Sequence, residues 1–218
     1  MHPTKQLYLF ISLGIIIAAS AFAWQLIQAN KIIIKPVDTQ LVSTNYYDIK
    51  IEDDDFTLGN PGAPLTVVLF GDYSCSDCQK KYSEITTFVK AHPQDVRMFL
   101  KNFPKGSLFF KANDLPERAA FCAGKQNNFW QFADAINEGS NKTDQKGLEQ
   151  IANDLKLDTT QWSDCLTSDE ATQKIKRVVD MSQTLGISTL PTIYINNKKI
   201  TLEKDLDITN LLTRFIAK

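Results

Sequence analysis

Apolar and polar residues follow two distinct patterns along the central part of the chain. Residues 65–70 and 96–100 are short, mostly apolar runs of the kind found in buried strands. Between them, from residue 75 to residue 91, apolar side chains recur at helical spacing and the pattern stops before a proline. The sequence therefore predicts an α/β fold with a central strand at residues 65–70 and a helix that opens at Cys75.

Helical patterns dominate after residue 100, and strand patterns return only near the C-terminus. Residues 46–51 alternate between apolar and polar side chains and predict an edge strand at the start of the domain. Asn196-Asn197 separates two strand-like runs and predicts a β-hairpin. The predicted helices are residues 111–124, 129–138, 145–155, 169–185 and 208–216, and the predicted hairpin strands are residues 192–195 and 198–201.

The N-terminal region differs from the rest because residues 7–27 carry no charge and are almost continuously apolar, with Lys5 before them. Their number is close to the roughly 20 residues that cross a bilayer as a helix. Ala21-Phe22-Ala23 also fits the small-x-small pattern of a signal-peptidase site. A cleaved signal and a retained anchor both stay open, and the apolar residues after Ala23 favour the anchor. Either one places the rest of the chain outside the cytoplasm, whereas a buried core helix would not.

Composition and charge fit one compact domain, or a domain that carries an insertion, in a chain of 218 residues. The 24 basic and 25 acidic residues nearly cancel. The basic residues are scattered and form no stretch that could follow a phosphate backbone. We therefore expect no nucleic-acid binding.

The chain has four cysteines, an even number that suggests pairing in an oxidising compartment. Cys75 and Cys78 are so close in sequence that they are expected to pair with each other, which leaves Cys122 with Cys165. A bond between Cys122 and Cys165 would close a long loop and stabilise the fold by about 4 kcal/mol. We interpret it as a structural disulfide; the alternative is two buried free thiols.

Two cysteines at positions i and i+3 of a helix start have a specific chemical consequence. The unpaired N–H groups of the first turn and the helix dipole stabilise an anion there, so Cys75 is the predicted nucleophile. Cys78 lies one turn inside the helix and would resolve mixed disulfides. Zinc would need four nitrogen or sulfur ligands, and with only two histidines in the chain we expect no metal site. A purely structural Cys75–Cys78 bond would not explain its place at a helix start.

Several motifs along the chain resemble the DsbA-like branch of the thioredoxin superfamily. They are Gly59-Asn60-Pro61-Gly62-Ala63-Pro64, Phe70-Gly71-Asp72-Tyr73-Ser74-Cys75-Ser76-Asp77-Cys78, Ala119-Ala120-Phe121-Cys122-Ala123 with Asn128-Phe129-Trp130, and Leu185-Gly186-Ile187-Ser188-Thr189-Leu190-Pro191-Thr192. The resemblance covers most of the exported chain. It implies a thioredoxin fold with an inserted all-helical subdomain, preceded here by the N-terminal signal or anchor helix.

The predicted domain boundaries follow from the patterns and the resemblance together. They are a signal peptide or membrane anchor at residues 1–29, a linker at 30–45, the first part of the thioredoxin domain at 46–105, the helical insertion at 106–182, and the second part of the thioredoxin domain at 183–218.

The resemblance also assigns roles to residues outside the cysteine pair. It implies that Pro191 is a cis-proline facing the active-site disulfide and that the backbone of Leu190 pairs with substrate chains. Ser76 and Asp77 stand where many family members carry Pro-His or Pro-Tyr, and a carboxylate beside the thiolate disfavours the anion. We therefore expect Ser76 and Asp77 to tune the thiolate and Cys75 to be less acidic than in the strongest oxidants.

The resulting functional expectation is an envelope thiol-disulfide oxidoreductase that exchanges its Cys75–Cys78 disulfide with cysteines of exported proteins. It would need no cofactor and would act as a monomer in the periplasm or at the outer face of the cytoplasmic membrane, anchored by residues 7–27 if these are retained. The resemblance implies a membrane redox partner of the DsbB or VKOR type. The alternatives are a disulfide reductase or isomerase, and a Cu(I)-binding metallochaperone that uses the two thiolates as soft ligands.

Overall fold

The computed structural model describes residues 17–24, 41–104, 113–138, 143–203 and 206–217. The chain divides into two compact units, Met1–Pro36 and Val37–Lys218. In the first unit, residues 17–24 form a helix with exposed apolar side chains, among them Phe22 and Trp24. Within the described ranges, no helix is long and apolar enough to cross a membrane. Most of the predicted anchor, at 7–16 and 25–27, lies outside the described residues.

The second unit is built on a five-stranded sheet with the order β1-β3-β2-β4-β5. Its strands are β1 (Thr57–Leu58), β2 (Leu65–Gly71), β3 (Val96–Asn102), β4 (Thr192–Ile195) and β5 (Lys198–Ile200). β2 and β3 are parallel, whereas β1 pairs with β3, β4 with β2, and β5 with β4 in antiparallel orientation. The predicted central strand is therefore confirmed, and it extends one residue further, to Gly71.

Side chains of β2 point alternately to two apolar cores, one on each face of the sheet. Val67 and Leu69 belong to the core that includes residues of helix α2 (Ser76–Ala91) and helix α8 (Ile208–Ile216). Val68 and Phe70 belong to the core that includes Val178 of helix α7 (Asp169–Thr184). Because both faces are covered, β2 can be apolar almost throughout.

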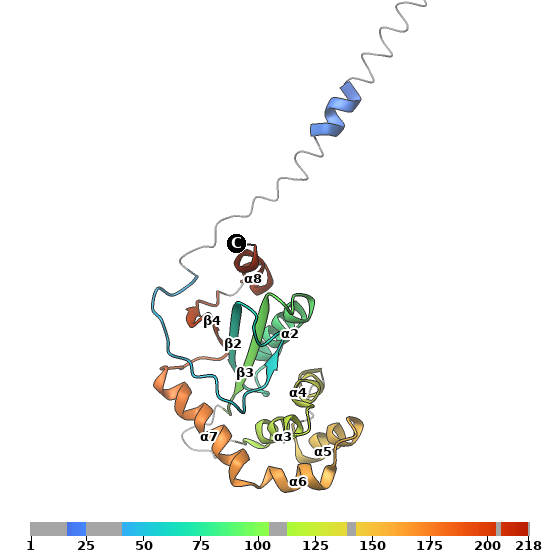
Figure 1. The fold of residues 1–218 in the computed structure, drawn as a ribbon, viewed down its shortest axis with the longest axis vertical. Helices are drawn as coiled ribbons and strands as arrows, with labels where there is room; N and C mark the ends of the chain where they lie inside the picture. The colour runs from blue at the N-terminus through green and yellow to red at the C-terminus, as the bar shows by residue number, and fades with distance from the viewer. Residues whose placement is uncertain (1–16, 25–40, 105–112, 139–142, 204–205, 218) are drawn as a thin grey trace, which may run out of the picture. The chain divides into compact units, whose positions relative to one another are not determined.

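The remaining helices follow β3 and lie together beyond one end of the sheet (Figure 1). They are α3 (Leu115–Gly124), α4 (Phe129–Glu138), α5 (Gln145–Asp154) and α6 (Thr159–Leu166), and α7 then leads back to the sheet. α3 contacts each of the other four. The helical stretch predicted from periodicity is thus present, with α6 as a helix that the sequence patterns did not indicate.

The hairpin between β4 and β5 turns at Asn196 and Asn197, whose φ values are 45° and 63°. Two successive residues with positive φ make a turn that matches the strand twist, and asparagine tolerates this conformation. The predicted hairpin is confirmed.

The predicted edge strand at residues 46–51 is wrong, because these residues form no strand. Among the apolar residues of this run, Tyr46 and Ile51 are exposed and only Ile49 is buried. The run therefore has no continuous apolar face that could pack against the core. The chain instead runs along the edge of β5. Val42 forms an isolated bridge with Ile200, and backbone hydrogen bonds follow from Ser43 N–H to Lys199 O, from Thr201 N–H to Leu41 O and from Tyr47 N–H to Asn197 O.

Candidate active site

Cys75 and Cys78 form a disulfide at the N-terminus of α2, with an S–S distance of 2.19 Å. Cys75 is the N-cap residue of the helix, and its sulfur accepts a hydrogen bond from the Cys78 backbone N–H at 3.1 Å. An N-cap side chain normally satisfies one of the unpaired N–H groups of the first turn. Here the cap atom is the Cys75 sulfur, so the helix offers a hydrogen-bond donor and its positive end to any negative charge on that sulfur.

The two sulfur-bearing residues differ in their access to solvent. Cys75 is half-buried, whereas only 4% of Cys78 is exposed. Ser76 and Asp77, which lie between them, are both exposed, and Asp77 is an acidic residue in the first helical turn. A thiolate from solution can therefore reach Cys75 but not Cys78.

The turn before Cys75 is held by a short network of hydrogen bonds. The Asp72 carboxylate accepts from the backbone N–H of Ser74 at 2.7 Å and from its hydroxyl at 2.6 Å. The Cys75 backbone N–H donates to the backbone oxygen of Asp72, and the Gln79 side-chain amide donates to the backbone oxygen of Tyr73. These bonds fix the direction in which the chain enters α2 and so the place of the Cys75 sulfur.

Gly71 permits a close approach at the end of β2. A Cβ atom at this position would lie 2.7 Å from Asn102 Oδ1 and 3.4 Å from Cys78 Cβ. The first distance is too short for any real side chain, so a larger residue would push the Asn102 amide away. Because Gly71 has no side chain, the Asn102 side chain and Cys78 can both approach its Cα atom closely.

The Leu190–Pro191 peptide bond is cis. It directly precedes β4, whose Thr192 lies opposite Phe70 of β2 in the antiparallel register. Since residues 71–75 continue from the same end of β2, the cis-proline loop and the cysteine pair occur at one end of the sheet. Leu190 and Pro191 are both half-buried. Pro191 also lines a surface hollow of about 420 Å³.

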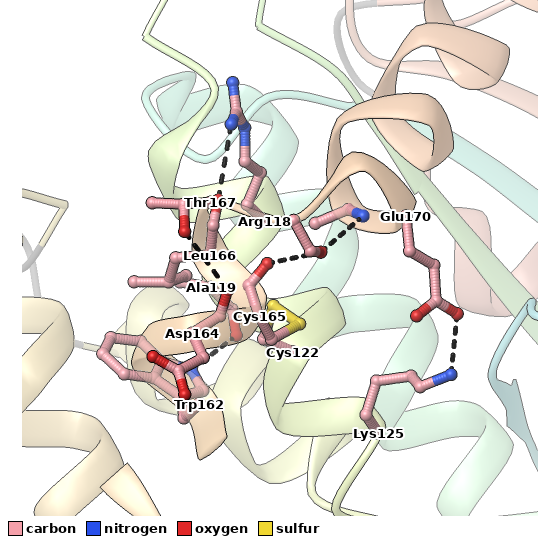
Figure 2. The surroundings of a disulfide bond; sticks show 12 residues. Arg118, Ala119, Cys122, Lys125, Trp162, Asp164, Cys165, Leu166, Thr167 and Glu170 are labelled. Atoms are coloured by element: carbon pink, nitrogen blue, oxygen red, sulfur yellow. Dashed lines mark hydrogen bonds and ion pairs between the residues drawn. A yellow bond between two sulfur atoms is a disulfide. The ribbon is translucent and has the colours of Figure 1, made fainter. Parts of the chain in front are cut away.

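The second disulfide, between Cys122 on α3 and Cys165 on α6, has an S–S distance of 2.00 Å (Figure 2). Cys122 is fully buried, and the Trp162 indole N–H donates to the Ala119 backbone oxygen at 3.0 Å beside it. The Arg118 guanidinium donates to the Leu166 backbone oxygen. The Cys122–Cys165 bond therefore joins two helices of the helical stretch, with Cys122 buried and Cys165 half-buried.

Glu117 is a buried carboxyl group that the sequence analysis missed. Only 4% of the residue is exposed, and among the described residues its Oε2 atom has no hydrogen-bond partner. Burial, with smaller contributions from Asp72 and Asp114, raises the pKa of Glu117 to about 8. In the sequence, Glu117 is a single acidic residue before the apolar run 119–123. An exposed acid at the start of a helix would give the same pattern.

No group of three or more histidine, cysteine or acidic side chains within the described ranges is arranged to hold a metal ion. His92 is the C-cap residue of α2, and its ring lies 4.5 Å from that of Phe88. When reduced, Cys75 and Cys78 would offer two sulfur ligands. Within the described residues, no third histidine, cysteine or acidic side chain lies near enough to complete a metal site. The arrangement is thus suited to disulfide exchange at Cys75.

Comparisons with known proteins place most of the chain in one family. The thioredoxin family model matches residues 52–213. Disulfide bond formation protein D of Bacillus subtilis is 28% identical over 158 residues, which are 69% of this chain and 71% of that protein. The crystal structure of oxidised BdbD from Bacillus subtilis has a TM-score of 0.61 and 25% identity over 75% of this chain and 91% of that one. A thioredoxin-like oxidoreductase from Silicibacter pomeroyi has a TM-score of 0.64 and 27% identity, covering 77% and 95%.

Proposed function

Since this chain belongs to the thioredoxin family, we propose that it is a protein disulfide oxidoreductase that passes its Cys75–Cys78 disulfide to cysteines of exported proteins. The observation that carries this proposal is the disulfide at the start of α2, with Cys75 accessible and capping the helix and Cys78 buried behind it. The names of its Bacillus relatives support the same activity.

The reaction follows from the difference between the two sulfurs. A substrate thiolate attacks the Cys75 sulfur, the Cys75–Cys78 bond breaks, and its electron pair goes to the Cys78 sulfur. A second substrate thiolate then attacks the substrate sulfur of the mixed disulfide, and Cys75 leaves as a thiolate. The Cys78 N–H at 3.1 Å and the helix start stabilise this leaving group. The substrate gains a disulfide and the enzyme holds two reduced cysteines.

The cis-proline loop is the proposed substrate contact. The backbone of Leu190 would pair with an extended substrate segment and present the substrate sulfur to Cys75. The partly buried Leu190 side chain packs against the apolar core that contains Val68 and Phe70, and this contact helps to hold the loop in place. An apolar side chain at this place favours unfolded chains, which expose apolar residues.

Ser76 and Asp77 set the direction of electron flow in this proposal. The Asp77 carboxylate lies one residue before Cys78 and two after Cys75, and a negative charge there opposes the Cys75 thiolate. A difference of roughly 150 mV separates thioredoxin from DsbA and corresponds to about 7 kcal/mol. Asp77 is therefore the residue that favours the second candidate, a disulfide reductase or isomerase.

The chain is proposed to work outside the cytoplasm, in the periplasm or at the outer face of the membrane, with residues 7–27 as signal or anchor. A membrane partner of the DsbB or VKOR type would reoxidise it. Cys122–Cys165 would serve as a structural bond within the insertion proposed at residues 106–182, between domain parts at 46–105 and 183–218.

The first test is the reduction potential of the Cys75–Cys78 pair in the chain from residue 37, by equilibration with glutathione and alkylation of free thiols. We expect a value closer to about −120 mV than to about −270 mV, the potentials of DsbA and thioredoxin. The oxidised chain should also transfer one disulfide to a reduced, unfolded protein, and Cys75→Ser should abolish the transfer.

A potential near that of thioredoxin would instead identify a reductase or isomerase, and Asp77→Asn should then move it toward more oxidising values. The control is Asp164→Asn, an exposed acid on α6. Stoichiometric Cu(I) binding without disulfide transfer would support a metallochaperone and refute the proposal.

A further inference from the structure

A surface hollow of about 420 Å³ adjoins the cis-proline loop, and the exchange between the two active-site sulfurs does not involve it. Thr189 and Pro191 of that loop line the hollow, together with Thr192, the first residue of β4. The Thr192 hydroxyl donates to the Thr189 backbone oxygen at 2.7 Å, which ties the loop to the strand. The volume of the hollow lies in the range of pockets that take small ligands.

A second wall of the hollow comes from the segment that covers the edge of β5. Ser43 and Tyr47 of this segment both line the hollow. The Ser43 N–H donates to the Lys199 backbone oxygen and the Tyr47 N–H donates to the Asn197 backbone oxygen, each at 2.9 Å. The Tyr47 ring also packs edge-on against the Tyr194 ring, with 5.2 Å between the ring centroids. These contacts fix the wall, so the hollow is formed before anything binds in it.

Lys199 is the one charged side chain among the described residues that line the hollow. It lies opposite Tyr194 in the register of β4 and β5, so both side chains are on the same face of the sheet. Lys199 is half-buried, whereas Lys198 is exposed and belongs to the other face, because successive residues of a strand alternate. Within the described ranges, the Lys199 ammonium forms no ion pair, unlike the buried ammonium groups of Lys101 and Lys174.

Residues with hydroxyl groups supply most of the remaining polar lining, namely Ser43, Tyr47, Thr189 and Thr201. In the part of the chain that the structure describes, none of these four hydroxyls donates a hydrogen bond, and Ser43 Oγ accepts one from the Asn45 N–H. No carboxylate is among the described lining residues. Free hydroxyl donors beside an ammonium without a counter-ion suit a carboxylate, which only accepts hydrogen bonds.

The place of the hollow beside the cis-proline loop indicates what occupies it. The proposed substrate contact lays an extended client segment along Leu190, with the client cysteine at Cys75. An extended chain advances about 3.3 Å per residue, and its side chains point alternately to two sides. Pro191 belongs both to this loop and to the lining of the hollow. Client residues a few positions from the reactive cysteine therefore pass the mouth of the hollow.

We propose that the hollow is a specificity subsite for an aspartate or glutamate side chain near the reactive cysteine of the client, and that Lys199 selects this side chain. The client carboxylate accepts hydrogen bonds from the Lys199 ammonium and from hydroxyls of the lining. A basic client side chain meets a like charge there and is disfavoured. This inference rests on the proposed disulfide exchange and adds the class of client sequence that the same site prefers.

The test is the rate at which the oxidised full-length protein forms a disulfide in synthetic peptides that contain two cysteines. The peptides differ at one position, up to four residues before or after the cysteines, which carries glutamate, glutamine or lysine. Each initial rate is divided by the concentration of peptide thiolate, because a nearby charge also shifts the pKa of the peptide thiols.

For the unmodified protein, we expect the glutamate peptide to react about threefold faster than the glutamine peptide and the lysine peptide about threefold slower, as for a partly exposed ion pair. This preference should appear on one side of the cysteines only, because the hollow extends from Pro191 toward β5.

Variants of Lys199 separate the subsite from the general charge of the surface. Lys199→Gln should make the three peptides react at equal rates, and Lys199→Glu should reverse their order. The matched control, Lys198→Gln, removes the same charge from the other face of β5 and should keep the preference. Dithiothreitol has no acidic side chain, so it should reduce the Cys75–Cys78 bond equally fast in all variants.

Equal rates for the three peptides with the unmodified protein would overturn the inference. An equal loss of preference in Lys198→Gln and Lys199→Gln would overturn it too, because the surface charge as a whole would then select the client. If dithiothreitol reduces the unmodified protein but the oxidised protein forms no disulfide in any peptide, the proposed function itself fails.

Discussion

Asp55, Lys101 and Lys174 form a buried ion-pair cluster next to the sheet. Its contacts predict that loss of Asp55 destabilises the fold more than loss of Lys101 does. Asp55 Oδ2 accepts from Lys101 at 2.5 Å, and Asp55 Oδ1 accepts from Lys174 at 2.7 Å. The Lys101 side chain is 1% exposed and that of Asp55 is 3% exposed. Among the described residues, Asp55 is the sole acidic partner of Lys101, whereas Asp55 keeps Lys174 and the Glu52 N–H if Lys101 is lost.

The two single substitutions should therefore differ strongly. Asp55→Asn preserves shape but leaves Lys101 buried without a counter-ion, which costs about 3–5 kcal/mol in the free energy of unfolding. Lys101→Met removes the buried cation and leaves Asp55 paired, so its cost should stay within about 1 kcal/mol. The double variant, Asp55→Asn with Lys101→Met, should recover most of the stability that Asp55→Asn loses, because methionine at position 101 needs no counter-ion.

Urea unfolding and thermal unfolding of the oxidised chain from residue 37 at pH 7 measure all three variants against the unmodified protein. For a domain of this size, Asp55→Asn should lower the Tm by roughly 6–20 °C. Equal costs for the two single variants, or no recovery in the double variant, would refute the reasoning. Either result would mean that water or Lys174 compensates the charges in a way that the distances do not suggest.

Three other measurements test separate parts of the structure. Cys122→Ala with Cys165→Ala should lower stability by about 4 kcal/mol and leave the potential of the active-site pair unchanged; a changed potential would contradict a purely structural role. Gly124→Ala should cost about 1–3 kcal/mol, because its Cβ would lie 2.2 Å from the Phe56 ring, and an unaltered urea midpoint would contradict this packing. The pKa of Glu117 is 4.5 when the chain is unfolded and about 8 when it is folded. Its stabilising contribution is therefore present below pH 4.5 and is lost as the pH rises through 8. Urea midpoints measured against pH should show that Glu117→Gln removes this decrease in stability.

The sequence predicted the elements whose apolar pattern is long and regular. The helices at 129–138 and 208–216 have the predicted bounds, and α2 begins one residue after the predicted start because Cys75 is its cap. The thioredoxin-like α/β fold with added helices is confirmed. α6 was missed because Trp162 is its one buried residue, and so short a helix shows no periodicity.

The site was predictable where the chemistry is local in sequence. The spacing of Cys75 and Cys78 and the start of a helix define the reactive pair without any tertiary information. Glu117 and Tyr73 are different, because they are 44 residues apart and come together only when α3 packs against the turn before α2. No local pattern distinguishes a buried acid of this kind from a solvated one.

The segment along β5 has a consequence for the behaviour of the domain in solution. A bare edge strand presents free N–H and C=O groups, and any extended polypeptide can pair with it. Here the hydrogen bonds that link Ser43 with Lys199 and Leu41 with Thr201 occupy that edge. An extended chain from another molecule therefore finds no free strand edge at β5, and this limits aggregation through that edge.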